Sequence, residues 1–173
     1  MSGLFAGGPA GENAPRCLKP PLLDFSDGTD RLAIGLTGWN NMLVRMALAR
    51  IVIVDSEEEK MSMIVLQEVD GKRAFPILIG INEAYAIDRR TRGEPVPRPM
   101  THDLINQLIG GLDCVLEHVV INELRDSTFY AKLCLRRNGE IVEVDSRPSD
   151  AIAVGAGNDV PIYVDEAVLR EVC

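Results

Sequence analysis

The chain has 173 residues, 46% of them hydrophobic, and a formal net charge of −8. This apolar content is enough for one globular domain with a sizeable core. Residues 1–45 hold four basic and four acidic residues, so the acidic excess falls entirely on the rest of the chain. An acidic body argues against broad, sequence-independent binding to nucleic acid or anionic lipid, because both need a positive surface. A local basic patch remains compatible with this composition.

Cysteine usage and hydropathy indicate the compartment. The cysteines are scattered, and no two have the two-residue spacing of a zinc or redox motif. We expect reduced thiols in a cytosolic protein. No apolar run approaches the ~20 residues of a membrane helix, and the N-terminus lacks the basic start and apolar stretch of a secretory signal. The sequence therefore predicts a cytoplasmic protein without a membrane partner.

The first 45 residues carry no persistent helical or strand pattern, and Gly, Pro, Asn and Asp interrupt them repeatedly. Two explanations stay open. Residues 1–45 are either a disordered arm or a misannotated N-terminal extension ahead of a true start at Met42 or Met46. A folded domain is predicted over residues 46–173.

The first part of this domain is predicted to form strands followed by a helix. Apolar and β-branched runs predict strands at Ala49–Val54, Met63–Val69 and Arg73–Ile79. Asp70-Gly71 lies between the last two strands and indicates a hairpin, because both residues tolerate positive φ. A helix is then predicted over Gly80–Arg90, followed by a proline-rich loop.

The second part begins with a helix over Thr101–Gly110, which has apolar residues on one face. Strict alternation over Ser127–Arg136 predicts a half-buried strand, and Asn138-Gly139 predicts a hairpin turn after it. The remaining expected elements are strands at Val115–Leu124, Glu140–Val144 and Val160–Val164, a helix from Ser149 to about Ala156, and a short last helix capped by Asp165.

An internal repeat links the two parts. Gly71 and Gly139 are 68 residues apart, and Glu83 and Asp150 are 67 apart. Each copy reads as strand, tight turn, strand, loop and helix. Short hairpin turns make a largely antiparallel sheet, so we predict an α+β fold with packed helices and an internal duplication of a hairpin-helix unit.

Two Arg-Pro motifs stand at predicted helix starts. They are Pro97–Leu104 and Asp145–Ala153. Thr101 and Ser149 are candidate caps, whose oxygens accept free amide protons of the helix. Asp103 and Asp150 then lie near the positive end of each helix dipole. This arrangement is compatible with an anion or substrate site, and equally with two well-formed helix starts.

Six motifs resemble the bifunctional nuclease domain family of bacteria and plants. The resemblance covers about Met46–Leu169, and its motifs are Phe75–Gly80, Glu83–Ile87, Arg98–Leu104, Thr128–Ala131, Asp145–Ala153 and Pro161–Val164. It implies DNase and RNase activity, with nucleic acid as the partner. One departure is Gly155–Asn158, where the family tends to continue its last long helix with aliphatic residues. Glycine disfavours a helix interior, so we expect a shorter or frayed helix after Asp150.

Candidate site residues follow from the chemistry of phosphodiester hydrolysis, which usually needs carboxylates, an activated water and cations that hold phosphate. The catalytic candidates are His102, Asp103, Asp150 and Glu83, and the substrate-binding candidates are Arg98, Arg147, Thr101 and Ser149. A divalent metal is one candidate cofactor, although no metal-binding spacing is present. The alternative also stays open: both aspartates serve helix dipoles, and both arginines pair with them. His118 is expected to be structural.

The main basic concentration of the body is Arg89, Arg90, Arg92 and Arg98, which flanks the proline-rich loop ahead of His102. It is either a solvated helix end or a short phosphate track.

Two functional hypotheses remain: a nuclease acting on DNA or RNA, and a non-catalytic binding or regulatory module that recognises a small anion or a protein partner. The strand Ile51–Val54 is apolar and carries little protective charge, so we also expect a homo-oligomer, most simply a two-fold dimer.

Overall fold

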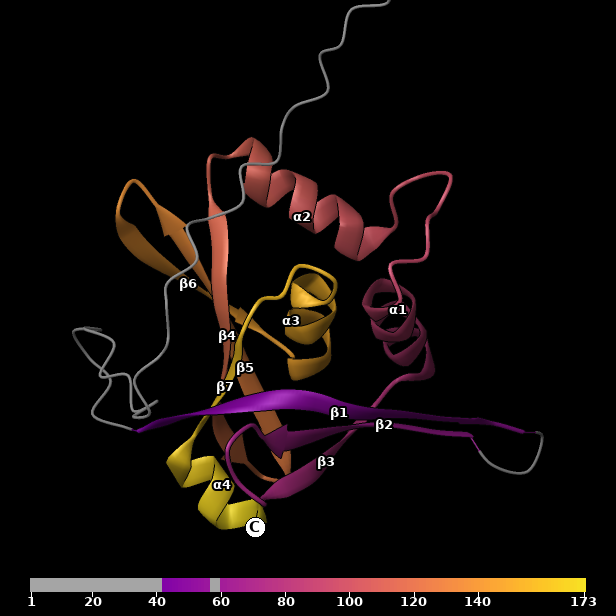
Figure 1. Cartoon of the computed structure of the whole chain (residues 1–173), viewed down its shortest axis with the longest axis vertical. Coiled ribbons are helices and arrows are strands. Elements are labelled where there is room, and N and C mark those ends of the chain that lie inside the picture. The colour runs from indigo at the N-terminus through magenta and orange to yellow at the C-terminus, as the bar shows by residue number, and fades with distance from the viewer. Residues whose placement is uncertain (1–41, 57–59) are drawn as a thin grey trace, which may run out of the picture.

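The computed structural model describes residues 42–56 and 60–173. Within these residues it contains one seven-stranded sheet, with the order β3-β2-β1-β7-β4-β5-β6, and four helices (Figure 1). β7 pairs in parallel with β4, and every other pairing is antiparallel. The predicted α+β class and mostly antiparallel sheet are therefore confirmed.

The first half of the sheet is a three-stranded meander followed by a helix. Its elements are β1 (Leu43–Asp55), β2 (Lys60–Glu68), β3 (Ala74–Ile79) and α1 (Ile81–Thr91). The turn between β2 and β3 contains the predicted Asp70-Gly71 pair. β1 begins at Leu43, six residues before the predicted start of this strand at Ala49.

The second half begins with α2 and then repeats the same order. Its elements are α2 (Thr101–Gly111), β4 (Val115–Arg125), β5 (Thr128–Arg137), β6 (Glu140–Ser146) and α3 (Pro148–Gly155). Asn138 and Gly139 have φ values of 51° and 87°, as a tight hairpin turn with two positive φ angles requires. The chain ends with β7 (Ile162–Asp165) and α4 (Glu166–Val172).

The two hairpins have equivalent strand registers. Met63 pairs with Leu78 between β2 and β3, and residues 68 positions later, Ala131 and Ser146, pair between β5 and β6. This correspondence supports the predicted duplication, which stays a prediction about the origin of the fold.

β7 joins the two halves at the centre of the sheet. It pairs with β1 at Leu43–Met46 on one side and with β4 at Val119–Ile121 on the other. The side chains of Val164 and Val119 are fully buried in the shared core. One continuous core therefore spans both meanders.

The helices α1 and α3 lie side by side over the sheet, and α2 crosses near their upper ends (Figure 1). Their apolar positions reach the core through Ile87 of α1 and Ile152 of α3, which are 0% and 2% exposed. Alternation in β2 and β5 brings Ile64 and Leu133 into the same core. This packing fixes where the starts of α1 and α3 lie.

The expectation that Ile51–Val54 belongs to an edge strand is only partly right. β1 as a whole is an interior strand, between β2 and β7. However, its pairing with β7 ends at Met46. Beyond Met46 no other strand in the described part of the chain pairs with β1 on that side, so the strand is interior at one end and an edge at the other.

The glycines after α3 end this helix early, as expected. α3 stops at Gly155, and Gly157 has a φ of +79°. A Cβ atom at Gly157 would lie 2.7 Å from the carbonyl oxygen of Arg90, so the backbones of this turn and of α1 approach too closely for a side chain.

Two further observations concern the predicted compartment. Among the described residues, Cys114, Cys134 and Cys173 are free thiols. In the same part of the chain, no helix is long and apolar enough to cross a membrane.

Candidate functional site

The starts of three helices meet around one arginine. Arg147 precedes α3 and donates from Nε to Asp150 Oδ2 at 2.7 Å and from Nη2 to Glu83 Oε1 at 2.9 Å. His102, the second residue of α2, places its Nε2 3.4 Å from Asp150 Oδ1. We call Glu83, His102, Arg147 and Asp150 the Arg147 cluster.

Local sequence explains how the two carboxylates of the Arg147 cluster are placed. Glu83 is the third residue of α1, and Asp150 is the third residue of α3. Both carboxylates therefore lie in the first turn of a helix, where the positive dipole end stabilises them. Pro148 fixes the first position of α3, which directs Arg147 and Asp150 toward each other.

Gly80 makes room for the Glu83 carboxylate. A Cβ atom at Gly80 would lie 2.2 Å from Glu83 Oε2. The carboxylate thus folds back over the residue that precedes α1, while its other oxygen accepts from Arg147. A side chain at Gly80 would displace it.

The electrostatics of the Arg147 cluster favour the charged forms of its ion pair. Burial alone would raise the pKa of Asp150, but the hydrogen bonds and charges of Arg147 and His102 outweigh burial and hold the pKa below its usual value. The hydrogen bonds to Asp150 and Glu83 raise the pKa of Arg147. The side chain of Arg147 is nevertheless 66% exposed, whereas that of His102 is 14% exposed.

A second cluster lies deeper, between α1 and the start of α2. Asp103 accepts from Arg89 Nη2 at 2.9 Å, from the Met100 amide at 3.0 Å, and from Arg90 Nη1. We call Arg89, Arg90 and Asp103 the Asp103 cluster. Burial would raise the pKa of Asp103. The hydrogen bond from the Met100 amide and the charges of the two arginines outweigh burial and hold the pKa below its usual value, so the carboxylate is charged.

Arg90 links this second cluster to the end of α3. Its Nε donates to the Ala153 carbonyl at 2.6 Å, and its Nη2 donates to the Val154 and Ala156 carbonyls at 3.3 Å. These carbonyls have no partner within a helix that ends at Gly155. Arg90 therefore caps the C-terminus of α3, where a cation is also favoured by the helix dipole.

The structure separates the eight candidates into four groups. Four of them form the Arg147 cluster. Asp103 lies in the second cluster, and the exposed Arg98 makes no hydrogen bond or ion pair with any described residue. The last two candidates are Thr101 and Ser149.

The proposed caps at Thr101 and Ser149 are wrong. The cap positions are Met100 for α2, whose amide donates to Asp103, and Arg147 for α3, which makes no side-chain cap hydrogen bond. The prolines explain this shift for α3, because Pro148 occupies the first helical position and moves Ser149 into the helix. Ser149 is buried, and Thr101 is exposed as the first residue of α2.

The basic concentration ahead of His102 is largely neutralised. Arg89 and Arg90 form ion pairs with Asp103. The Nη2 atom of Arg92 lies 3.0 Å from the Oδ1 atom of Asp88. Of these arginines only Arg98 lacks an acidic partner among the described residues. The phosphate track expected from the sequence is thus reduced to one exposed guanidinium.

A metal ion would have to compete with Arg147. In the described segments, no group of three His, Cys, Asp or Glu side chains is arranged to hold a metal. The nearest donor set is Glu83, Asp150 and His102, but the guanidinium of Arg147 lies between the two carboxylates. These residues would fit a divalent cation only after Arg147 moves away.

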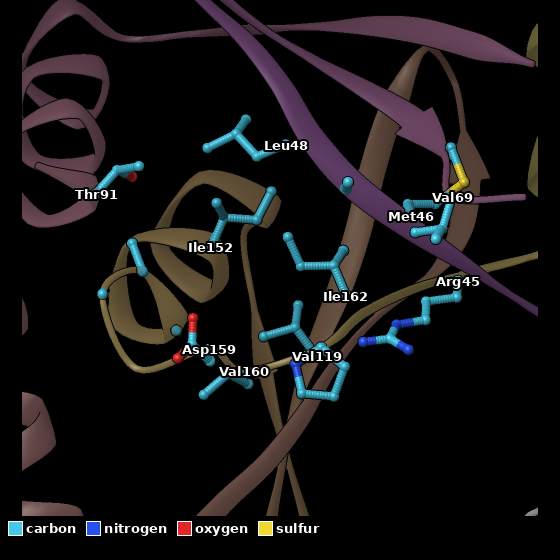
Figure 2. Close-up of a pocket in the computed structure, with 15 residues that line it drawn as sticks. Arg45, Met46, Leu48, Val69, Thr91, Val119, Ile152, Asp159, Val160 and Ile162 are labelled. Atoms are coloured by element: carbon cyan, nitrogen blue, oxygen red, sulfur yellow. The ribbon is translucent and has the colours of Figure 1, made fainter. Parts of the chain in front are cut away.

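Two features carried no clear signal in the sequence. The first is the pairing of Arg90 with Asp103 and with the end of α3, because it depends on how three helices pack. The second is an open pocket of about 320 Å³ at the opposite end of α3 from Asp150 (Figure 2). The pocket lies where β1 diverges from β7, and its lining residues include Arg45, Leu48, Ile152 and Val160.

His118 is buried in β4, as the sequence suggested for a structural residue. It is 3% exposed, its Nε2 has no hydrogen-bond partner among the described residues, and its ring meets the Tyr163 ring edge to face with 5.7 Å between the ring centroids. Burial lowers the pKa of His118, which keeps the imidazole neutral.

Comparison with known proteins gives one family. Residues 64–173 match the bifunctional nuclease domain. An uncharacterized protein of Mycobacterium tuberculosis is 42% identical over 127 residues, which are 73% of this chain and 76% of that protein. A protein of Oryza sativa subsp. indica named bifunctional nuclease 1 is 27% identical over 109 residues, 61% of this chain and 33% of the rice protein.

Proposed function

Because this chain belongs to the bifunctional nuclease domain family, we propose that it hydrolyses phosphodiester bonds in DNA, RNA or both at the Arg147 cluster. One observation carries the proposal. An exposed arginine is held between two helix-start carboxylates, beside a histidine that contacts one of them. This arrangement combines a phosphate-binding cation with an acid–base group.

Arg147 supplies the phosphate contact. Its Nε and Nη2 are engaged by Asp150 and Glu83, whereas its Nη1 makes no hydrogen bond with a described residue. The two carboxylates fix the plane of the guanidinium, and Nη1 is left to donate to a phosphate oxygen.

His102 supplies the base. A neutral imidazole that donates from Nε2 to Asp150 leaves Nδ1 as an acceptor. Nδ1 takes a proton from the attacking water as the new P–O bond forms, and Asp150 stabilises the imidazolium that results. The bond to the leaving oxygen then breaks, and that oxygen takes a proton from solvent. If Arg147 moved from between them, Glu83 and Asp150 could instead hold a divalent cation, which would polarise the phosphate.

A second candidate function has its own support. Both carboxylates of the Arg147 cluster engage the arginine, and Asp103 is neutralised in another cluster. These contacts suit a module that binds an anionic ligand without cleaving it.

A cleavage and binding experiment separates the two functions. Fluorescent single- and double-stranded DNA and RNA would be incubated with the full chain in EDTA, Mg²⁺ or Mn²⁺, and binding would be followed by anisotropy. We expect His102→Ala to lower the cleavage rate about 100-fold while retaining binding, and Arg147→Ala to weaken both. Arg136→Ala is the matched control, because Arg136 forms an exposed ion pair with Glu117 away from the cluster.

The outcomes differ clearly. Cleavage that persists at the same rate in both variants would indicate a contaminating nuclease and contradict the assignment. Binding that is lost in Arg147→Ala, without cleavage in any sample, would establish the anion-binding module instead.

A further inference from the structure

The pocket between β1 and β7 is separate from the Arg147 cluster. It lies at the C-terminal end of α3, whereas Asp150 lies at the N-terminal end, and its volume is about 320 Å³. Small-molecule sites have volumes of roughly 300–1,000 Å³ and are mostly apolar, with a few polar groups. We call this pocket, whose lining includes Arg45, Leu48, Asp159 and Ile162, the β1–β7 pocket. Its size suits a small ligand.

The fold leaves this space open from two sides. β1 pairs with β7 only as far as Met46, and the register of β1 with β2 shifts just beyond, between Leu48 and Arg50. A bulge bends a strand and increases its twist, so β1 diverges from β7 here. On the other side, the turn after α3 lines the pocket with Gly-Ala-Gly at residues 155–157. A turn with so few side-chain atoms leaves the space unfilled.

The pocket has apolar walls between two charged ends. Leu48, Val160 and Ile162 are half-buried and line it with apolar side chains. Figure 2 shows Arg45 on one side of the pocket and Asp159 on the other, with Ile162 between them. Among the described residues, no other charged side chain lines the pocket. A ligand that fills it therefore meets a cation at one end, apolar side chains along its length and an acid at the far end.

Arg45 indicates the charge of the ligand. Its side chain is exposed and makes no hydrogen bond or ion pair with any described residue. Other arginines of this acidic chain, such as Arg73 and Arg136, form ion pairs with carboxylates of the protein itself. A guanidinium presents a fork of donors that matches the two oxygens of a carboxylate. An unpaired guanidinium at the end of an apolar pocket therefore suits an anion with an apolar body.

Asp159 limits the charge that the ligand can carry at its other end. The residue is exposed and has a φ of 53°, a conformation that Asp and Asn adopt more readily than most residues. A second anionic group at this end of the pocket would be repelled by the Asp159 carboxylate. The pocket should therefore accept a monoanion and discriminate against a dianion of the same length.

We propose that the β1–β7 pocket binds a small monocarboxylate with an apolar body of about eight carbons, for which a pocket of this size has room. The carboxylate binds Arg45, and the apolar body lies along Ile162 and Val160. Binding covers apolar surface that is exposed in the free protein, which supplies the hydrophobic part of the affinity. The proposal does not depend on nuclease activity, because no lining residue belongs to the Arg147 cluster.

Isothermal titration calorimetry of the full chain tests the proposal with straight-chain probes of equal length. Octanoate carries the predicted anion, 1-octanol is uncharged, octylamine carries the opposite charge, and octanedioate carries a second carboxylate. We expect octanoate to bind at least about tenfold more tightly than each of the other probes. Because the apolar body is the same throughout, the differences report on the end groups.

Variants at both ends of the pocket locate the ligand. Arg45→Met should weaken octanoate binding about tenfold, whereas Arg45→Lys keeps the charge and should retain most of the affinity. Arg137→Met is the matched control, since Arg137 is also exposed without an ion pair to a described residue. Asp159→Asn tolerates the same φ and should strengthen octanedioate binding severalfold while changing octanoate binding by less than about twofold. Urea denaturation checks that each variant is folded.

Several results would overturn the proposal. Octanoate that does not bind the wild type would remove its basis. Equal affinities for octanoate and 1-octanol would show that apolar contact alone accounts for binding. An unchanged octanoate affinity in Arg45→Met would place the ligand elsewhere. Methyl NMR provides an independent measurement: we expect octanoate to shift the signals of Leu48, Val160 and Ile162, and shifts confined to other methyl groups would contradict the assignment.

Discussion

The Arg147 and Asp103 clusters use the same chemistry in opposite ways. Both place a helix-start aspartate against arginine. In the Asp103 cluster the side chains of Arg89, Arg90 and Asp103 are 17%, 9% and 18% exposed. In the Arg147 cluster the arginine is 66% exposed. The first cluster is thus enclosed and joins three helices, whereas the second presents a guanidinium to solvent.

The difference lies in what else each arginine binds. Arg90 donates from its Nε and Nη2 to the carbonyls at the end of α3, so it stabilises a helix terminus. Arg147 donates from Nε and Nη2 to Glu83 and Asp150 only. Its Nη1 makes no hydrogen bond with a described residue and is available to a ligand. An ion pair is therefore informative about function only after all donors of the arginine are assigned.

The largest effect on stability should come from Arg90. Arg90→Met removes the cap of α3 and leaves Asp103 with one arginine, so we expect a loss of about 3 kcal/mol in the free energy of unfolding. Arg147→Met should cost less than about 1 kcal/mol, because its ion pairs are exposed. Urea denaturation measures both, and equal losses would contradict the distinction between the clusters.

The Asp103 cluster should also determine part of the acid sensitivity. The pKa of Asp103 is lowered on folding, so its stabilisation is complete above the unfolded value near 3.9 and is lost as the pH falls through the folded value. Asp103→Asn should lower the free energy of unfolding by about 2 kcal/mol at pH 7. It should also flatten the dependence of that free energy on pH below about 4. Denaturation curves from pH 7 to pH 2 provide the measurement, and an unchanged slope in the variant would exclude this role.

A smaller effect, confined to the Arg147 cluster, is expected from Gly80. Gly80→Ala places a methyl group where the Glu83 carboxylate lies, and the carboxylate must move away from Arg147. We expect a severalfold change in affinity for a phosphodiester ligand with a stability change below about 1 kcal/mol. Gly110→Ala is the matched control, because a Cβ atom at Gly110 would meet open space and the residue has no positive φ. Unchanged affinity in Gly80→Ala would show that Glu83 does not position the arginine.

The smallest effect should come from Arg98. It touches no described residue through a hydrogen bond or ion pair, so Arg98→Ala should leave stability unchanged. Ligand affinity should fall about twofold at most, through lost long-range attraction, and the difference should vanish at high salt. A large loss of affinity measured by anisotropy would instead place Arg98 in the binding site.

The fold was more predictable than the site. Alternation, β-branched runs and the Asp70-Gly71 and Asn138-Gly139 turns predicted every strand after β1 within a few residues, because these signals act over short distances. The first six residues of β1 were missed. The pairing of Arg147 with Asp150 was also foreseeable, since three residues separate them. The sequence could not show that Asp103 binds Arg89 and Arg90 rather than Arg98, because that choice depends on the packing of α1 against α2 and α3.

The position of β7 has a consequence for how the protein is made. The strand that joins the two halves of the sheet follows both of them in the sequence. The backbone groups of β1 and β4 that pair with β7 can therefore be satisfied by it only after Ile162–Asp165 has been synthesised. Final closure of the sheet therefore requires long-range contacts, which form slowly. A chain truncated by a dozen residues would retain both meanders and yet lose the strand that connects them.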